Sequence, residues 1–133
     1  MSKIVNISEA ASLALHSLTL IAKAEKMINA IEISNDMQFS KNHLSKILQV
    51  LVKYDYLSSI RGPKGGFILK KKAKEITLLE IYEIFEGKIL DHSCAMHNNK
   101  VCPLNSCIFG QLPGQFSKDF EAYLKNKTIA DLI

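Results

Sequence analysis

Residues 40–70, SKNHLSKILQVLVKYDYLSSIRGPKGGFILK, decide the fold of this chain. Ser40 is a residue type that often caps the start of a helix. Behind it, apolar residues recur at intervals of three and four, as they do on one face of a helix; they are Leu44, Ile47, Leu48 and Leu51. This spacing predicts an amphipathic helix over residues 41–56 whose apolar face packs against a core.

The opposite face of this predicted helix carries hydrogen-bond donors and cations and no acidic residue: Lys41, Asn42, Ser45, Lys46, Gln49 and Lys53. Such a face fits the major groove of DNA when its helix is the second of a helix-turn-helix. Solvated lysine faces are also common on ordinary helices. The helix taken alone leaves both interpretations open.

The residues that follow favour DNA. YLSSI (56–60) and GFILK (66–70) are short strand-like runs, and RGPKG between them is rich in turn residues. The pattern predicts a β-hairpin, the wing of a winged helix, with Arg61 and Lys64 near its tip. The basic run KKKAK (70–74) comes next. Contact with phosphates explains these adjacent basic elements better than chance does.

Helix start signals lie on both sides of this stretch. Asn6 and Asn29 each stand three residues before a glutamate, which is capping-box spacing, and they predict helices over 6–26 and 29–37. The second of these and the helix at 41–56 would form the helix-turn-helix. Thr77 opens a further helix in the same way, with Gly87 as its stop.

We therefore expect a mainly α fold with a small β-hairpin, organised in three parts. Residues 1–87 would be a winged helix-turn-helix DNA-binding domain, residues 88–112 a cysteine-containing loop that binds a cluster, and residues 113–133 a dimerisation segment. The Cys102–Pro103 pair resembles the N-cap and first residue of a new helix, which would put Cys107 about one turn inside it.

The cysteines Cys94, Cys102 and Cys107 are the candidates for chemistry. An odd number of thiols in a reducing compartment argues against disulfides. Thiolates suit iron–sulfur clusters and zinc. Zinc would need a fourth ligand, for which His92 and His97 are near, but no compact zinc-ribbon spacing is present. Metal-free reactive or structural thiols are the third interpretation.

The C-terminal segment carries an apolar and aromatic strip: Phe109, Leu112, Phe116, Phe120, Tyr123 and Leu124. We expect Pro113–Gly114 to kink or break its helix. A strip this far from the winged-helix core needs a partner, and a second copy of the chain fits because most soluble oligomers are symmetric. The alternative is that the strip folds back on its own core.

Composition limits the class of protein. The 133 residues fit one domain, and 17 basic against 13 acidic residues give a net charge of +4, which suits an anionic partner. No apolar run approaches the ~20 residues of a membrane span and the N-terminus lacks a secretion signal, so we expect a cytoplasmic protein. No catalytic arrangement or cofactor fingerprint is present, so we do not expect an enzyme.

Residues 33–87, the three cysteines and the ending KTIADLI (127–133) resemble the Rrf2-type regulators, a family that includes iron–sulfur and nitric-oxide-sensing members. The most specific parts are RGPKGGF (61–67) and the cysteine segment directly after EIFEG (83–87). The resemblance implies a homodimer in which a long C-terminal helix crosses to the partner. It also implies one [2Fe-2S] or [4Fe-4S] cluster per subunit on the three cysteines, whose state changes DNA affinity.

The fourth cluster ligand differs among family members. Some use a histidine three residues after the last cysteine, but that position is Gly110 here. Others recruit a residue of the first helix, sometimes from the other subunit, which makes Glu9 and His16 candidates and His16 the first choice. The alternative is that His16 is simply packed among leucines with a backbone hydrogen-bond partner. Asp91, His92, His97, a small molecule or water are the remaining options.

The expected partner is double-stranded DNA with a palindromic operator. Ser40, Lys41, His43 and Lys46 would enter the major groove, and Arg61 and Lys64 would contact DNA from the wing. A change at the cysteines would move the helix opened by Thr77 and reset the recognition helices, which must lie ~34 Å apart. The alternative is a cluster-free winged-helix regulator controlled by cysteine oxidation or a protein partner.

Overall fold

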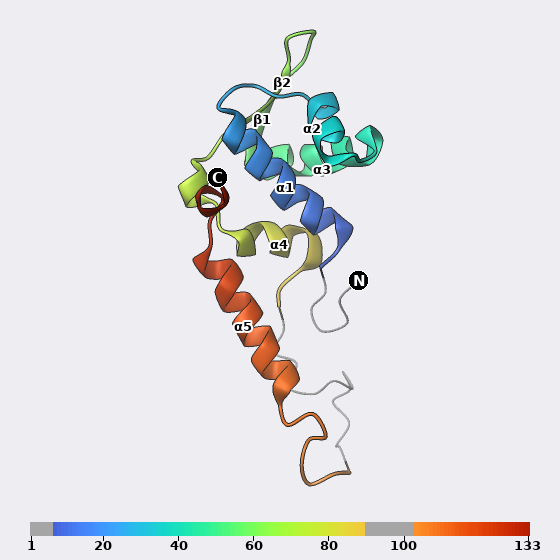
Figure 1. The fold of residues 1–133 in the computed structure, drawn as a ribbon, viewed down its shortest axis with the longest axis vertical. Helices are drawn as coiled ribbons and strands as arrows, with labels where there is room; N and C mark the ends of the chain where they lie inside the picture. The colour runs from blue at the N-terminus through green and yellow to red at the C-terminus, as the bar shows by residue number, and fades with distance from the viewer. Residues whose placement is uncertain (1–6, 90–102) are drawn as a thin grey trace.

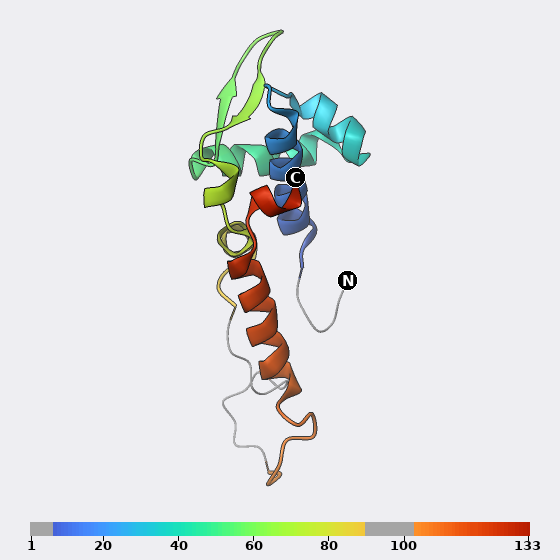
Figure 2. The same cartoon turned by 60° about the vertical axis from the view of Figure 1, so that its left-hand side comes forward.

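The computed structural model describes residues 7–89 and 103–133. Helix α1 (Glu9–Ala24) lies at the centre of a globular head and contacts α3, α4, β2 and the C-terminal turn. Figures 1 and 2 show the wing hairpin projecting from one end of this head and α5 extending from the opposite end. In the described residues, no helix has the length and apolar character needed to span a bilayer.

Helix α1 begins later than the sequence indicated. Its N-cap is Ser8, whose Oγ accepts a hydrogen bond from the backbone N of Ala11 at 3.1 Å. The start predicted at Asn6, which lies outside the described residues, was therefore wrong by two positions. The helix ends at Ala24, followed by Glu25 in the left-handed conformation with φ of 53°.

Helices α2 (Ala30–Met37) and α3 (Lys41–Lys53) form the predicted helix-turn-helix. The capping box of α2 is confirmed, because Asn29 Oδ1 accepts from Glu32 N at 2.8 Å while Glu32 Oε2 accepts from Asn29 N at 3.0 Å. Ser40 is the N-cap residue of α3, although its side chain makes no capping hydrogen bond. The four apolar residues predicted to face the core are all buried: Leu44, Ile47, Leu48 and Leu51.

Helix α3 ends three residues earlier than predicted. Asp55 adopts a φ of 66°, which turns the chain out of the helix and into the wing. Strands β1 (Leu57–Ile60) and β2 (Gly66–Leu69) then pair antiparallel, with Leu57 opposite Leu69 and Ile60 opposite Gly66, as predicted.

The wing is anchored to the connection between α1 and α2. The backbone N of Phe67 donates to the carbonyl oxygen of Ile28 at 2.8 Å, and the N of Ile28 donates to the carbonyl oxygen of Phe67 at 3.2 Å. A Cβ at Gly66 would lie 2.7 Å from that Ile28 oxygen, so this close approach of two backbones requires glycine. The base of the hairpin is consequently fixed to the head.

The short helix η1 (Ala73–Glu75) leads from the wing to α4 (Leu78–Glu86). Thr77 caps α4 as predicted, since its Oγ1 accepts from Glu80 N at 3.2 Å, and Gly87 ends the helix. Leu78, Ile81 and Tyr82 of α4 are buried.

Helix α5 (Leu112–Asn126) and η2 (Ile129–Leu132) complete the chain and correct two expectations. Residues 103–111 form bends and turns, so Cys107 precedes the helix and does not lie inside it. Pro113 and Gly114 occupy the first turn of α5 and do not break it. A proline is tolerated there because its missing N–H would have no partner within the helix.

The C-terminal residues close back onto the head. Leu78 N donates to the carbonyl oxygen of Lys127 at 2.9 Å, Ile129 N donates to that of Ile76 at 2.9 Å, and Ile129 is fully buried. Phe120 of α5 packs edge-on against Tyr82 of α4, with ring centroids 5.3 Å apart. Phe120 and Leu124 of the aromatic strip thus pack on the chain's own core, which was the alternative interpretation, whereas Tyr123 is 55% exposed.

Candidate nucleic-acid interface and sensing site

The outward face of α3 is polar and basic. Lys41, Asn42, Lys46 and Gln49 are exposed, and α3 contains no acidic residue. Ser40 is also exposed at the helix start. Because Leu44 and Leu48 are fully buried on the other side, the rotation of α3 about its axis is fixed and this face stays outside.

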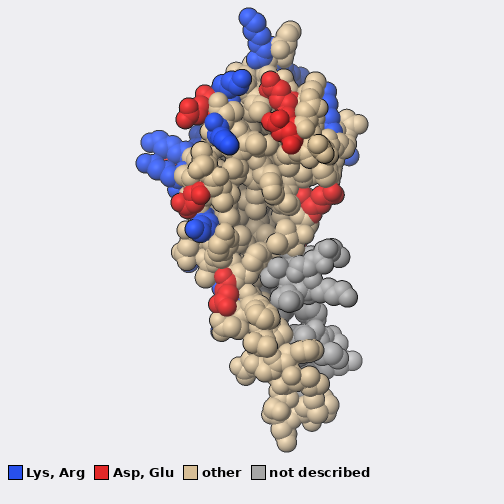
Figure 3. Space-filling model, viewed as in Figure 1, with Lys and Arg blue, Asp and Glu red and all other residues tan. Residues whose placement is uncertain are grey.

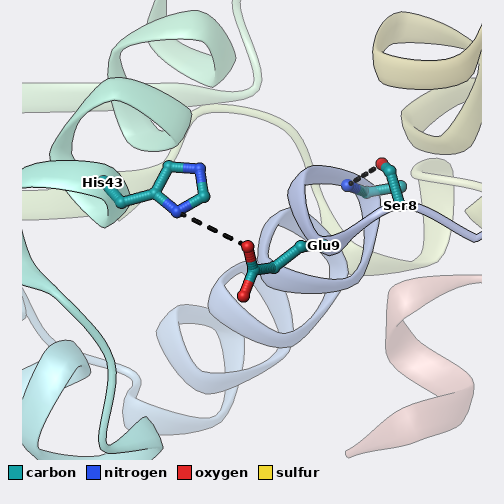
Figure 4. Close-up of polar contacts among 4 residues, drawn as sticks. Ser8, Glu9 and His43 are labelled. Carbon is teal, nitrogen blue, oxygen red and sulfur yellow. Dashed lines mark hydrogen bonds and ion pairs between the residues drawn. The ribbon is translucent and has the colours of Figure 1, made fainter. Parts of the chain in front are cut away.

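His43, predicted to contact DNA, is turned toward α1. Its Nδ1 lies 4.0 Å from Oε2 of Glu9 (Figure 4). Its ring centroid lies 5.4 Å from that of Phe39. The His43 side chain is 39% exposed, between the solvent-facing and the buried side chains of α3. No local sequence pattern predicts this pairing, because the two residues are far apart in the chain.

The wing presents two cations. Arg61 and Lys64 are exposed around a turn in which Gly65 N donates to the carbonyl oxygen of Gly62 at 2.9 Å. Blue side chains stand at the hairpin tip in Figure 3, at the end of the molecule remote from α5. The two elements expected to contact DNA therefore belong to the same part of the head.

The lysines that follow the wing make contacts within the fold and also add positive charge to the surface. Lys70 Nζ donates to Asp55 Oδ1 at 2.8 Å, and this bond holds the pKa of Asp55 below its usual value. Lys71 Nζ lies 4.3 Å from the centre of the Tyr56 ring. Lys72 and Lys74 are exposed beside the wing, where they can meet phosphates.

Helix α4 connects the wing with α5. Burial raises the pKa of Tyr56 at the base of the wing, and a hydrogen bond with Glu80 of α4 raises it further. On the other side, Tyr82 of α4 meets Phe120 of α5. One short helix thus contacts both the DNA-facing part and the C-terminal part of the chain.

Cys107 is the one candidate ligand of the cysteine set that lies in the described residues; Cys94 and Cys102 lie outside them, as do His92 and His97. Its thiol is exposed. Backbone hydrogen bonds from Gln111, Phe109 and Gly110 lower its pKa and so favour the thiolate, the form that binds metals. In residues 7–89 and 103–133, no three His, Cys, Asp or Glu side chains gather as a metal site.

His16 is exposed and is not a packed core histidine. Its Nδ1 lies 2.6 Å from the carbonyl oxygen of Ser12, which can only accept, so Nδ1 donates, and in the neutral ring Nε2 is the nitrogen with the lone pair. His16 lines a groove of about 1040 Å³ with Glu9 and other residues of α1, and with Met37, Phe39 and Leu132.

His16 and Cys107 lie at separate places in one chain. His16 belongs to α1 in the head, whereas residues 103–111 lie beyond the far end of α5 (Figure 1). The two predicted ligands are therefore not brought together within one subunit.

Residues 103–117, PLNSCIFGQLPGQFS, form what we term the apolar stalk. This segment contains no charged residue, and it exposes Leu104, Ile108, Phe109, Leu112 and Phe116, with Ile108 79% exposed. Figure 3 shows the lower end of the molecule without the blue and red side chains that cover the head. Contiguous exposed apolar surface of this kind marks a binding surface.

Comparison with known proteins agrees with this architecture. Residues 7–133 match the family model Rrf2, described as an iron-dependent transcriptional regulator. The chain belongs to the Rrf2 family of transcriptional regulators. The family assignment confirms that this protein is a regulator and not an enzyme.

Three Rrf2-related proteins are informative. The transcriptional regulator NsrR of Geobacillus kaustophilus is 33% identical over 115 residues, which cover 82% of this chain and 75% of NsrR. BadM of Rhodopseudomonas palustris is 38% identical over 74 residues, so the match spans 56% of this chain and about half, 47%, of BadM. The structure of CymR, the global cysteine regulator of Bacillus subtilis, has a TM-score of 0.77 at 23% identity, covering 96% and 95% of the two chains. The last similarity establishes the fold.

Proposed function

We propose that this Rrf2 regulator binds double-stranded DNA as a homodimer and that an iron–sulfur cluster on Cys94, Cys102 and Cys107 controls its affinity. The observation that carries the proposal is the division of the chain into two ends. One end exposes the basic residues of α3 and the wing, and the other exposes Cys107 with a thiol pKa lowered by the backbone. Helix α4 contacts the elements leading to both.

In the DNA complex, α3 lies in the major groove with Ser40, Lys41 and Lys46 toward the DNA, and Arg61 and Lys64 of the wing contact the neighbouring backbone or minor groove. His43 stands at the edge of this surface, since its Nδ1 already faces Glu9. A symmetric dimer would place two such surfaces on a palindromic operator, one for each half-site.

The dimer is supported by the apolar stalk and by the groove along α1. The stalk exposes large apolar side chains without any charge, whereas the groove offers apolar residues of α1 together with Met37 and Phe39. A stalk that crosses to the partner's groove covers both surfaces at once. It also carries Cys107 toward the His16 side of the partner, which one chain alone does not achieve.

Some residues of this chain have the chemistry needed to bind an iron–sulfur cluster. Three thiols, one of them Cys107 with a thiolate favoured by backbone donors, can hold it, and His16 has Nε2 available as a fourth ligand from the partner subunit. When bound, the cluster would supply a redox- and nitric-oxide-responsive centre.

The chain's own residues would transmit the change. Residues 88–111 connect α4 to α5 in the sequence, so a rearrangement there would shift the Tyr82–Phe120 contact. Glu80 then passes the movement of α4 to Tyr56 at the base of the wing. Such a shift alters the separation of the two recognition helices and hence operator affinity.

A second candidate function is a cluster-free regulator in which the cysteines respond by oxidation or a protein partner is the effector. Two observations favour it: the fold is that of CymR, whose description is a global cysteine regulator, and Cys107 is an exposed thiol with a lowered pKa.

The deciding experiment is anaerobic visible absorption with iron and sulfide counts on the wild type, Cys102→Ser and the matched surface variant Ser106→Ala. Colour and iron in the wild type and Ser106→Ala, but lost in Cys102→Ser, are expected. A colourless wild type without iron, whose operator affinity falls on thiol oxidation, would instead establish the cluster-free regulator.

A further inference from the structure

Three polar side chains form one outward line on α3. Asn42, Lys46 and Gln49 are spaced i, i+4 and i+7, which places them on the same side of a helix. All three are exposed. Within the described part of the chain, neither amide makes a hydrogen bond, so both keep their donors and acceptor for a ligand.

The neighbouring side chains that are buried or held toward α1 leave Asn42, Lys46 and Gln49 as the part of α3 that can face the bases. His43 is held toward α1 by Glu9 and Phe39, and Leu44, Leu48 and Leu51 are fully buried. With the rotation of α3 fixed in this way, Asn42 in the first turn and Gln49 in the third are the exposed amides of the recognition helix.

Spacing along the helix sets the spacing of the bases they can reach. Seven residues advance an α-helix by ~10.5 Å. Successive base pairs are ~3.4 Å apart. A recognition helix that follows the groove therefore brings Asn42 and Gln49 to bases about three pairs apart, with Lys46 between them.

The chemistry of the side chains then selects the bases. An amide of Asn or Gln matches the N7 acceptor and N6 donor of adenine in a bidentate pair, and lysine matches the O6 and N7 acceptors of guanine. We propose that Asn42 and Gln49 each recognise an adenine in the major groove, about three base pairs apart in each half-site, and that Lys46 recognises a guanine between them. This inference rests on the proposed binding of DNA and adds the specificity of that site.

The test begins with selection of binding sequences from random double-stranded DNA by the full-length wild type, Asn42→Ala, Gln49→Ala and the control Asn126→Ala, an exposed amide at the end of α5. We expect a motif with two A·T pairs about three positions apart. Asn42→Ala loses about 10-fold discrimination at one pair and Gln49→Ala at the other, while the control keeps both.

A second measurement modifies the DNA instead of the protein. Replacing one motif adenine by 7-deazaadenine removes the N7 acceptor and leaves base pairing intact, so wild-type affinity falls at both positions. The affinity of Asn42→Ala falls only for the adenine assigned to Gln49. Full sensitivity of both variants to both replacements, or an unchanged motif in both variants, overturns the assignment and leaves DNA binding intact. The absence of any enriched motif for the wild type overturns the proposed function itself.

Discussion

Nδ1 of His43 on the recognition helix lies 4.0 Å from Oε2 of Glu9 in the first turn of α1. The two side chains are 39% and 64% exposed, so solvent screens their attraction and the pair is worth only ~0–1 kcal/mol. The effect of the pair on DNA affinity is separate from its effect on stability, because Glu9 places a negative charge beside the surface proposed to contact phosphates.

Glu9→Gln should raise affinity for DNA and change the free energy of unfolding by less than about 1 kcal/mol. The reason is that the substitution removes a carboxylate near α3 while leaving its size unchanged. Fluorescence anisotropy with a labelled duplex measures the affinity, and Glu121→Gln on α5 is the matched control. Weaker binding by Glu9→Gln would mean that the pair positions His43 for DNA.

Lys46→Ala should weaken DNA binding, because an exposed cation of α3 is lost from the interface. If Lys46 also contacts a phosphate, the slope of log affinity against log salt falls by about one. Titrations at several salt concentrations measure both effects. Lys118→Ala, which removes an exposed lysine of α5, should leave them unchanged. Equal affinities of Lys46→Ala and wild type would contradict the docking of α3.

Ile108→Asp should dissociate the dimer without unfolding the head. Ile108 is 79% exposed on the apolar stalk, so the charge costs nothing within one chain but is expensive in a buried interface. Sedimentation analysis gives the oligomeric state, and circular dichroism reports the helices. Ile60→Asp on β1 is the control, since Ile60 is 58% exposed on the wing. A dimeric Ile108→Asp would place the interface elsewhere.

Ile129→Ala should lower the free energy of unfolding by ~2–5 kcal/mol, because the side chain is fully buried against the head. Ile133→Ala, four residues later and 59% exposed, should change it by less than about 0.5 kcal/mol. Urea denaturation at one fixed protein concentration measures both. Similar midpoints for the two variants would show that the C-terminal turn does not stabilise the head.

Asp131→Asn should destabilise the protein at neutral pH but not in acid. Asp131 Oδ2 accepts from Thr128 N at 2.9 Å, and this bond lowers the pKa of Asp131. A lowered pKa contributes stability above the ordinary value of ~3.9 and loses it as pH falls through the folded-state value. Denaturation curves of both proteins from pH 7 to pH 2 should therefore converge in acid, whereas exposed Asp36→Asn follows the wild type. A gap that persists at pH 2 would assign the loss to packing.

Local patterns in the sequence predicted most of the fold. The capping box at Asn29, the side-chain cap at Thr77 and the apolar stripe of α3 are confirmed, because each depends on residues three or four apart in one helix. The box predicted at Thr77 is incomplete, since Glu80 Oε2 accepts from Thr77 Oγ1 and not from its backbone N. The hairpin is confirmed for a similar reason, since its strands and turn are contiguous. The candidate residues for DNA and metal binding remain predictions.

The errors arose where contacts between distant segments decide the outcome. The pairing of His43 with Glu9 joins α3 to α1, and no periodicity indicates it. Proline is compatible with a break as well as with a helix start, and the location of Pro113 in the first turn of α5 decides between them. The burial of Leu124 and Ile129 likewise depends on α4 and α1, whose surfaces the tail sequence does not describe.

The bridge between Thr77 and Thr128 joins the residue that opens α4 to the residue that opens η2, just after α5. Helix α4 packs on the head, so residues 88–111, with all three cysteines, are an excursion between two helices, and backbone hydrogen bonds hold the start of α4 to the residues after α5. The length and chemistry of such an excursion can change while the helix-turn-helix and wing keep their geometry. Evolution or protein design could thus change the signal that the regulator responds to while the same head is retained.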